Sequence, residues 1–162
     1  MNQEHSLQWQ LFEALQSSRR LIVFAESCTA GLVAATMGQI PGVSDYLCGS
    51  AVTYRSETKL AWLGIDAADL ARHTAVSQCV TEAMARNVLQ RTPEASLAVA
   101  VTGHLGPNAP AELDGVVFIS VAKRSSAAIQ TERKQLTSTS RADRQTETVQ
   151  SVLSAALDAI NA

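Results

Sequence analysis

Aromatic side chains are scarce in this chain of 162 residues, because three Phe, two Trp and two Tyr make up only 4% of it. Trp9 and Trp62 stand in no pattern of alternating basic and aromatic residues, so we expect them to serve in packing rather than in base stacking. An excess of positive charge is also lacking, since the formal net charge is -2 at pH 7. Without a positive field that would attract phosphates, we predict no nucleic-acid partner.

Cysteine is equally sparse, and Cys28, Cys48 and Cys79 form no CxxC pair. Three thiols in this arrangement predict neither a disulfide framework nor a zinc knuckle. Long apolar runs are absent as well, since nothing approaches the roughly 18 consecutive apolar residues that suit a membrane span. Residues 1–5 are polar and lack the basic and apolar regions of a signal peptide. We therefore expect a cytoplasmic protein with no membrane partner.

Short apolar runs alternate along the chain with stretches in which apolar residues recur at helical spacing. The runs predict strands at 21–25, 46–54, 97–101, 116–121 and, as an edge strand, 127–136. The helical spacing predicts helices at 7–18, 32–37, 56–63, 66–73 and 77–91, and a closing helix around 149–160. Strands interleaved with helices predict an α/β fold, with residues 1–162 forming a single-domain three-layer α/β/α sandwich.

Two strand ends carry small hydroxyl residues and glycines. The first strand runs into Glu26-Ser27-Cys28-Thr29-Ala30-Gly31, directly before a helix, and the strand 97–101 runs into Thr102-Gly103-His104-Leu105-Gly106-Pro107. Open α/β sheets bind ligands outside the carboxyl ends of their strands. The two segments therefore predict one shared pocket at an edge of the sheet.

The Ser27 segment has two interpretations. Ser and Thr before a helix are common N-caps. The same geometry offers unpaired N–H groups and a partial positive charge to a phosphate or to the oxyanion of acyl transfer. Cys28 competes with Ser27 as a nucleophile, because a helix N-terminus favours the thiolate, although most such cysteines are buried hydrophobes. His104 is the one histidine in the predicted site loops and could act as an acid, a base or a ligand.

Tyr54 and Lys59 flank a junction between a strand and a helix whose N-cap we expect to be Ser56. On their own they are typical of a half-buried tyrosine and a surface lysine. A lysine becomes a general base only where burial or a neighbouring cation lowers its pKa from about 10.4. Held against a serine hydroxyl, it could then accept the proton, as in Ser-Lys hydrolases.

Five blocks of this sequence resemble the CinA C-terminal domain family in order and spacing. They are Glu26 to Gly31, Ile40-Pro41-Gly42, Val52-Thr53-Tyr54 with Lys59, His73-Thr74-Ala75-Val76-Ser77, and Val101-Thr102-Gly103. The resemblance runs from about Ala25 to Val121 and more loosely to the end. It implies a mixed central sheet, a CinA C-terminal-like domain over residues 1–162, and a possible homo-oligomer.

The resemblance also implies an activity, because active members of the family are nicotinamide mononucleotide amidohydrolases that release nicotinate mononucleotide and ammonia. By resemblance Ser27 is the nucleophile, Lys59 its general base and Tyr54 a supporting hydrogen-bond partner. The pocket would be lined by Thr29, Ala30, Gly31, Thr102, Gly103 and His104. Such a mechanism requires no metal and no cofactor, and the ligand would be a pyridine mononucleotide.

The sequence departs from the family pattern at three places. Ala30 stands where the family has a glycine, and its methyl group would oppose a positive φ angle. His104 and Leu105 replace smaller or apolar residues, and a following glycine pair is missing, which would enlarge and stiffen the loop. The usual Gly-Asp-Arg motif after the last edge strand is missing, with Thr137-Ser138-Thr139-Ser140 in its place, and Arg141 or Arg144 are alternative anion partners. Three hypotheses therefore remain open: an amidohydrolase for nicotinamide mononucleotide, a catalytically inactive relative that binds a small nucleotide-like ligand, and a hydrolase whose altered loop accepts a different amide or ester.

Overall fold

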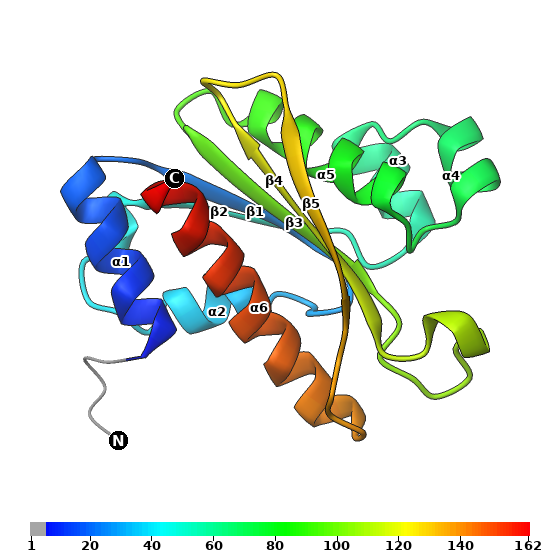
Figure 1. Ribbon diagram of the computed structural model, residues 1–162. Helices are drawn as coiled ribbons and strands as arrows, with labels where there is room; N and C mark the ends of the chain where they lie inside the picture. The colour runs from blue at the N-terminus through cyan, green and yellow to red at the C-terminus, as the bar shows by residue number, and fades with distance from the viewer. Residues whose placement is uncertain (1–5) are drawn as a thin grey trace.

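The computed structural model describes residues 6–162, and the polar segment 1–5, including His5, lies outside the described residues. Figure 1 shows one sheet covered by helices on both faces. The sheet has the order β2-β1-β3-β4-β5. β1 (Ile22–Glu26) pairs in parallel with β2 (Leu47–Val52) and β3 (Leu97–Gly103). β4 (Val116–Lys123) and β5 (Ile129–Gln135) are antiparallel. The single α/β domain with a mixed sheet is confirmed.

One face of the sheet carries α1 (Leu7–Ser18), α2 (Leu32–Met37) and the long α6 (Arg141–Asn161). The other face carries α3 (Ser56–Leu63), α4 (Ala67–His73) and α5 (Gln78–Arg91). Two short 3-10 turns, Val43–Asp45 and Ala111–Leu113, lie in the connections. No helix within residues 6–162 combines the length and the apolar character needed to cross a bilayer.

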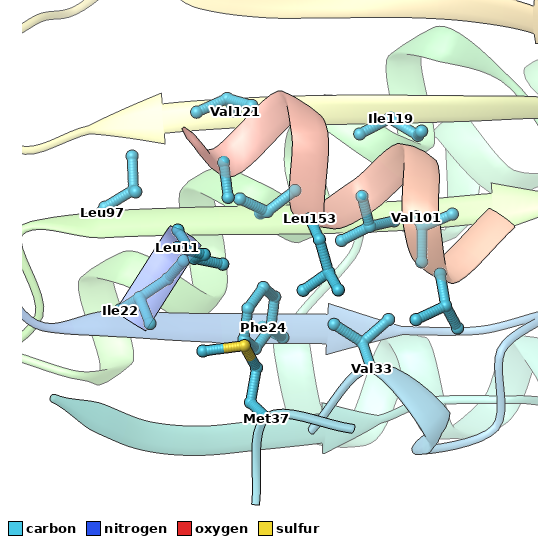
Figure 2. Close-up of a cluster of buried hydrophobic side chains, with 14 of the residues drawn as sticks. Leu11, Ile22, Phe24, Val33, Met37, Leu97, Val101, Ile119, Val121 and Leu153 are labelled. Carbon is cyan, nitrogen blue, oxygen red and sulfur yellow. The ribbon is translucent and has the colours of Figure 1, made fainter. Parts of the chain in front are cut away.

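The alternation of side chains along each strand supplies two cores. Ile22 and Phe24 pack toward α1, α2 and α6, whereas Val23 and Ala25 pack toward α5. Figure 2 shows the first of these cores, with Leu153 of α6 among the side chains of the sheet. β3 and β4 are buried on both faces, as their apolar sequences predict.

Three local predictions need correction. β3 does not end at Val101 but continues through Gly103, which pairs with Val117 of β4. The N-cap of α3 is Arg55 rather than Ser56, because the Arg55 N–H donates to the Thr58 Oγ1 (3.2 Å). Ala30 does adopt a positive φ of 53°, a left-handed conformation that costs an alanine about 1 kcal/mol.

Candidate active site

The carboxyl ends of the three parallel strands meet at one edge of the sheet, as the strand-end argument predicts. A cavity of about 200 Å³ opens there. Its lining comes from the turn after β1, the junction of β2 and α3, the connection of α4 and α5, the loop after β3 and the start of α6. The lining residues are Ser27, Cys28, Tyr54, Lys59, Ala75, Val76, Gly103, His104, Leu105, Gly106, Pro107 and Arg141.

Ser27 and Lys59 are in direct contact at this cavity. The Lys59 Nζ lies 2.9 Å from the Ser27 Oγ and 2.6 Å from the carbonyl oxygen of Thr53, with the Tyr54 carbonyl at 3.5 Å. Only 1% of the Lys59 side chain is exposed. Burial disfavours the charged ammonium and lowers the pKa of Lys59 to about 8. The amine is thus able to exchange a proton with the serine hydroxyl near neutral pH.

The neighbouring thiol is in a different state. Cys28 is 5% exposed, and burial raises the pKa of its thiol to about 12. The thiol therefore stays protonated at neutral pH and is a poor nucleophile. Between the two candidates that the sequence left open, the structure favours the Ser27 hydroxyl, which has a base within hydrogen-bond distance.

The amino end of α2 does not offer free N–H groups, contrary to the expectation of an anion site there. The carboxylate of Glu26, the last residue of β1, is fully buried and folds back beneath the helix. It accepts hydrogen bonds from the Thr29 and Ser50 hydroxyls and from the backbone N–H groups of Gly31, Val33 and Ala34, at 2.7 to 3.0 Å. The N–H groups of Ala30 and Leu32 donate to backbone carbonyls. Glu26 therefore occupies the position predicted for a phosphate or an oxyanion.

The predicted ligand-binding residues accordingly divide into two groups. Gly103 and His104 line the cavity. Thr29, Ala30, Gly31 and Thr102 do not: Thr29 and Gly31 donate to Glu26, and the buried Thr102 hydroxyl shares a hydrogen bond of 2.8 Å with Thr81. These four residues shape the turn and the sheet edge beneath the cavity.

The structure separates the two arginines that the sequence left as alternative anion partners. Arg144 pairs with both carboxylate oxygens of Asp114, at 2.8 and 2.9 Å, and is thereby committed to holding the loop after β3. Arg141 lies at the cavity, where it donates to the Tyr54 hydroxyl (2.8 Å) and to the Gly106 carbonyl. Arg141 thus bridges the two sides of the cavity mouth.

Sequence reasoning missed two supports of the site. Glu26 was part of the motif but carried no role, although a buried carboxylate before a helix start is a signal for capping. Nothing in the sequence indicated a role for Gln145 of α6, because its partners lie far away in the chain. Its side-chain amide donates to the carbonyls of Cys28 and Thr29 at 3.2 Å. These contacts fix the turn that presents Ser27.

Comparison with known proteins gives the family. The model of the CinA C-terminal domain matches residues 4–160. A CinA-like protein of Mycolicibacterium gilvum is 49% identical over 105 residues, 64% of this chain and 25% of that protein. This chain therefore spans about a quarter of the length of that curated relative.

Two crystal structures extend the likeness over the whole fold. The competence/damage inducible protein CihA from Agrobacterium tumefaciens has a TM-score of 0.90 at 30% identity, covering 96% of this chain and 94% of that one. A CinA superfamily protein from Klebsiella pneumoniae has a TM-score of 0.89 at 25% identity, covering 96% of both chains. With its sequence matched from residue 4 to residue 160, this chain belongs to the CinA C-terminal domain family.

Proposed function

We propose that this protein is an amidohydrolase that converts nicotinamide mononucleotide and water to nicotinate mononucleotide and ammonia. The observation that carries the proposal is the buried contact between the Ser27 Oγ and the Lys59 Nζ, at 2.9 Å. The family resemblance supplies the substrate, and the geometry supplies the chemistry of acyl transfer.

The surroundings of Lys59 suit a general base. A neutral amine has two N–H bonds and one lone pair, and its three neighbours are the carbonyls of Thr53 and Tyr54 and the Ser27 hydroxyl. With both N–H groups directed at carbonyl oxygens, the lone pair faces the Ser27 O–H. The two carbonyls thereby orient the amine for proton transfer from serine.

The reaction then proceeds in two balanced steps. The Ser27 oxygen attacks the carboxamide carbon while its proton passes to Lys59. The carbon–nitrogen bond breaks, and the leaving amide nitrogen takes that proton and departs as ammonia. Water adds to the resulting ester, gives one proton to Lys59, and releases the carboxylic acid as Ser27 regains its proton.

The mouth of the cavity suits the anionic end of a mononucleotide. A cavity of about 200 Å³ is smaller than the usual ligand pocket of roughly 300 to 1,000 Å³, so it would hold the carboxamide ring while the ribose phosphate extends outward. Arg141 stands at that mouth, hydrogen-bonded to Tyr54 and Gly106. Its guanidinium would exchange these two neutral acceptors for the charged phosphate, a stronger partner.

The test is to incubate the purified chain with nicotinamide mononucleotide and to quantify ammonia and nicotinate mononucleotide. Ser27→Ala is expected to lower the rate on the order of 1,000-fold or more, because it removes the nucleophile. Ser125→Ala is the matched control and should retain the rate, because Ser125 lies in an exposed turn and does not line the cavity. Thermal stabilisation by the nucleotide without any product would instead support the binding-only alternative and refute hydrolysis.

A further inference from the structure

Three side chains with different donor atoms meet where α4 is followed by α5. The carboxylate of Asp69, the imidazole of His73 and the thiol of Cys79 offer ligand atoms that all lie within 4.8 Å of one another. Within residues 6–162 this is the only such group of three. Oxygen, nitrogen and sulfur donors together form a ligand set suited to Zn²⁺, whereas Mg²⁺ and Ca²⁺ prefer oxygen alone.

The fold explains why these residues converge although the sequence shows no metal motif. Asp69 and His73 are four residues apart on α4 and therefore share one face of the helix. Cys79 is the second residue of α5, after the chain has turned back. The short connection between the helices thus brings a third donor to the face that already holds two.

The spacing requires only small side-chain movements. Bonds to zinc of about 2.0 to 2.3 Å in a tetrahedral site place neighbouring ligand atoms roughly 3.3 to 3.8 Å apart. In the structure the three ligand atoms lie within 4.8 Å of one another, so each would have to move by about 1 Å. None of the three side chains forms a hydrogen bond with another residue in the range 6–162, so binding would break none. His73 is exposed and the other two are half-buried, which leaves room for water as a fourth ligand.

A metal at this place would act on the wall of the cavity. The connection that it would close contains Ala75 and Val76, both of which line the cavity beside Ser27 and Lys59. α4 has no fully buried residue, and Thr74 after it adopts a positive φ of 64°, unfavourable for a β-branched residue. Leu70 packs against the core from a partly buried position, so a bond through a metal from α4 to α5 would add a constraint to that packing.

We propose that Asp69, His73 and Cys79 bind Zn²⁺, and that the metal joins α4 to α5 and fixes the cavity wall formed by Ala75 and Val76. The proposal goes beyond amide hydrolysis and does not depend on it. Asp69, His73 and Cys79 do not line the cavity, so the metal would act on the position of the wall and not on a ligand in the cavity.

The binding test uses the full chain without an affinity tag, treated with a chelator and titrated with Co²⁺ as a spectroscopic substitute for Zn²⁺. We expect one equivalent of Co²⁺ to produce a sulfur-to-cobalt charge-transfer absorption together with the strong visible bands of a tetrahedral site, and Zn²⁺ to abolish both. Cys79→Ser should eliminate the charge-transfer band, and His73→Gln should weaken binding at least tenfold. Cys48→Ser changes another half-buried thiol and should leave the spectrum unchanged.

Circular dichroism of the apo variants shows whether each is folded before metal is added. A folded wild-type chain that gives no charge-transfer band overturns the proposed site, as does a band that persists in Cys79→Ser. The effect on the wall is measured by hydrogen exchange, in which Zn²⁺ should slow exchange of the amides of residues 74–77 in the wild type and not in Cys79→Ser. If Zn²⁺ binds to the wild type and leaves the exchange of these amides unchanged, the proposal that the metal fixes the cavity wall is wrong.

Discussion

Replacing Glu26 by glutamine tests the arrangement on which the candidate site stands. The Glu26 carboxylate is fully buried and accepts five hydrogen bonds, three of them from backbone N–H groups around the start of α2. Glutamine has nearly the same shape but exchanges one acceptor oxygen for an NH2 donor. The substitution therefore changes hydrogen bonding and charge while it leaves packing intact.

The hydrogen bonds show which of the two Glu26 carboxylate oxygens an NH2 group can replace with the smaller loss of stability. The Oε2 accepts from two backbone N–H groups, those of Gly31 and Val33, whereas the Oε1 accepts from one, that of Ala34, and from the Ser50 hydroxyl. Because a hydroxyl can turn and accept, the amide NH2 should take the place of Oε1 and leave only the Ala34 N–H without a partner. An unsatisfied buried donor costs about 1 to 3 kcal/mol, and the remaining bonds lose their charge assistance.

We therefore expect Glu26→Gln to lower the free energy of unfolding by about 3 kcal/mol. For a chain of this size that corresponds to a fall in Tm of roughly 6 to 12 °C, measured by calorimetry at neutral pH. Glu57→Gln is the matched control, because Glu57 is exposed and pairs with the exposed Arg55, so the substitution should leave Tm unchanged. A fall of less than about 2 °C in Glu26→Gln would show that the carboxylate does not hold the start of α2.

Two further predictions concern Lys59 and Gly103. Burial lowers the pKa of Lys59 to about 8, and the neutral amine is the proposed base. The kcat/KM for amide hydrolysis should therefore rise with pH and level off above about 8. A profile that is flat from pH 6 to 9 would contradict that role. Gly103→Ala should destabilise the chain by about 1 to 3 kcal/mol in urea unfolding, because a Cβ at Gly103 would lie 2.5 Å from the Val117 Cγ1; an unchanged midpoint would refute this packing argument.

The sequence predicted the order of helices and strands because both cores leave a periodic trace. Ile22 and Phe24 alternate with Val23 and Ala25 between the two faces of the sheet, and such alternation within an apolar run is typical of a central strand. The meeting of the strand ends followed from the parallel order alone. The extent of β3 was misjudged because Gly103, a residue that favours turns, nevertheless pairs with Val117 of β4.

Contacts between segments far apart in the chain could not be predicted in the same way. A carboxylate shortly before a helix indicates capping in general, but the particular partners of Glu26, up to eight residues ahead and on a neighbouring strand, depend on the fold. The choice between Arg141 and Arg144 likewise depends on where Asp114 lies, which only the folded loop determines. The sequence thus indicated which residues belong to the site, whereas their hydrogen-bond partners are determined by the folded structure.

Sheet register and the catalytic proposal are linked through one hydrogen-bonded path. The Thr53 N–H donates to the Glu26 carbonyl at 2.8 Å, which extends the pairing of β2 with β1 past the strand ends. The Thr53 carbonyl accepts from the Lys59 Nζ, and that nitrogen contacts the Ser27 Oγ. A shift of β2 by one residue would turn the Thr53 carbonyl away from Lys59. Lys59 would then lose the partner that orients its lone pair toward Ser27, so the parallel pairing of β1 and β2 is a requirement of the proposed proton transfer as well as of the fold.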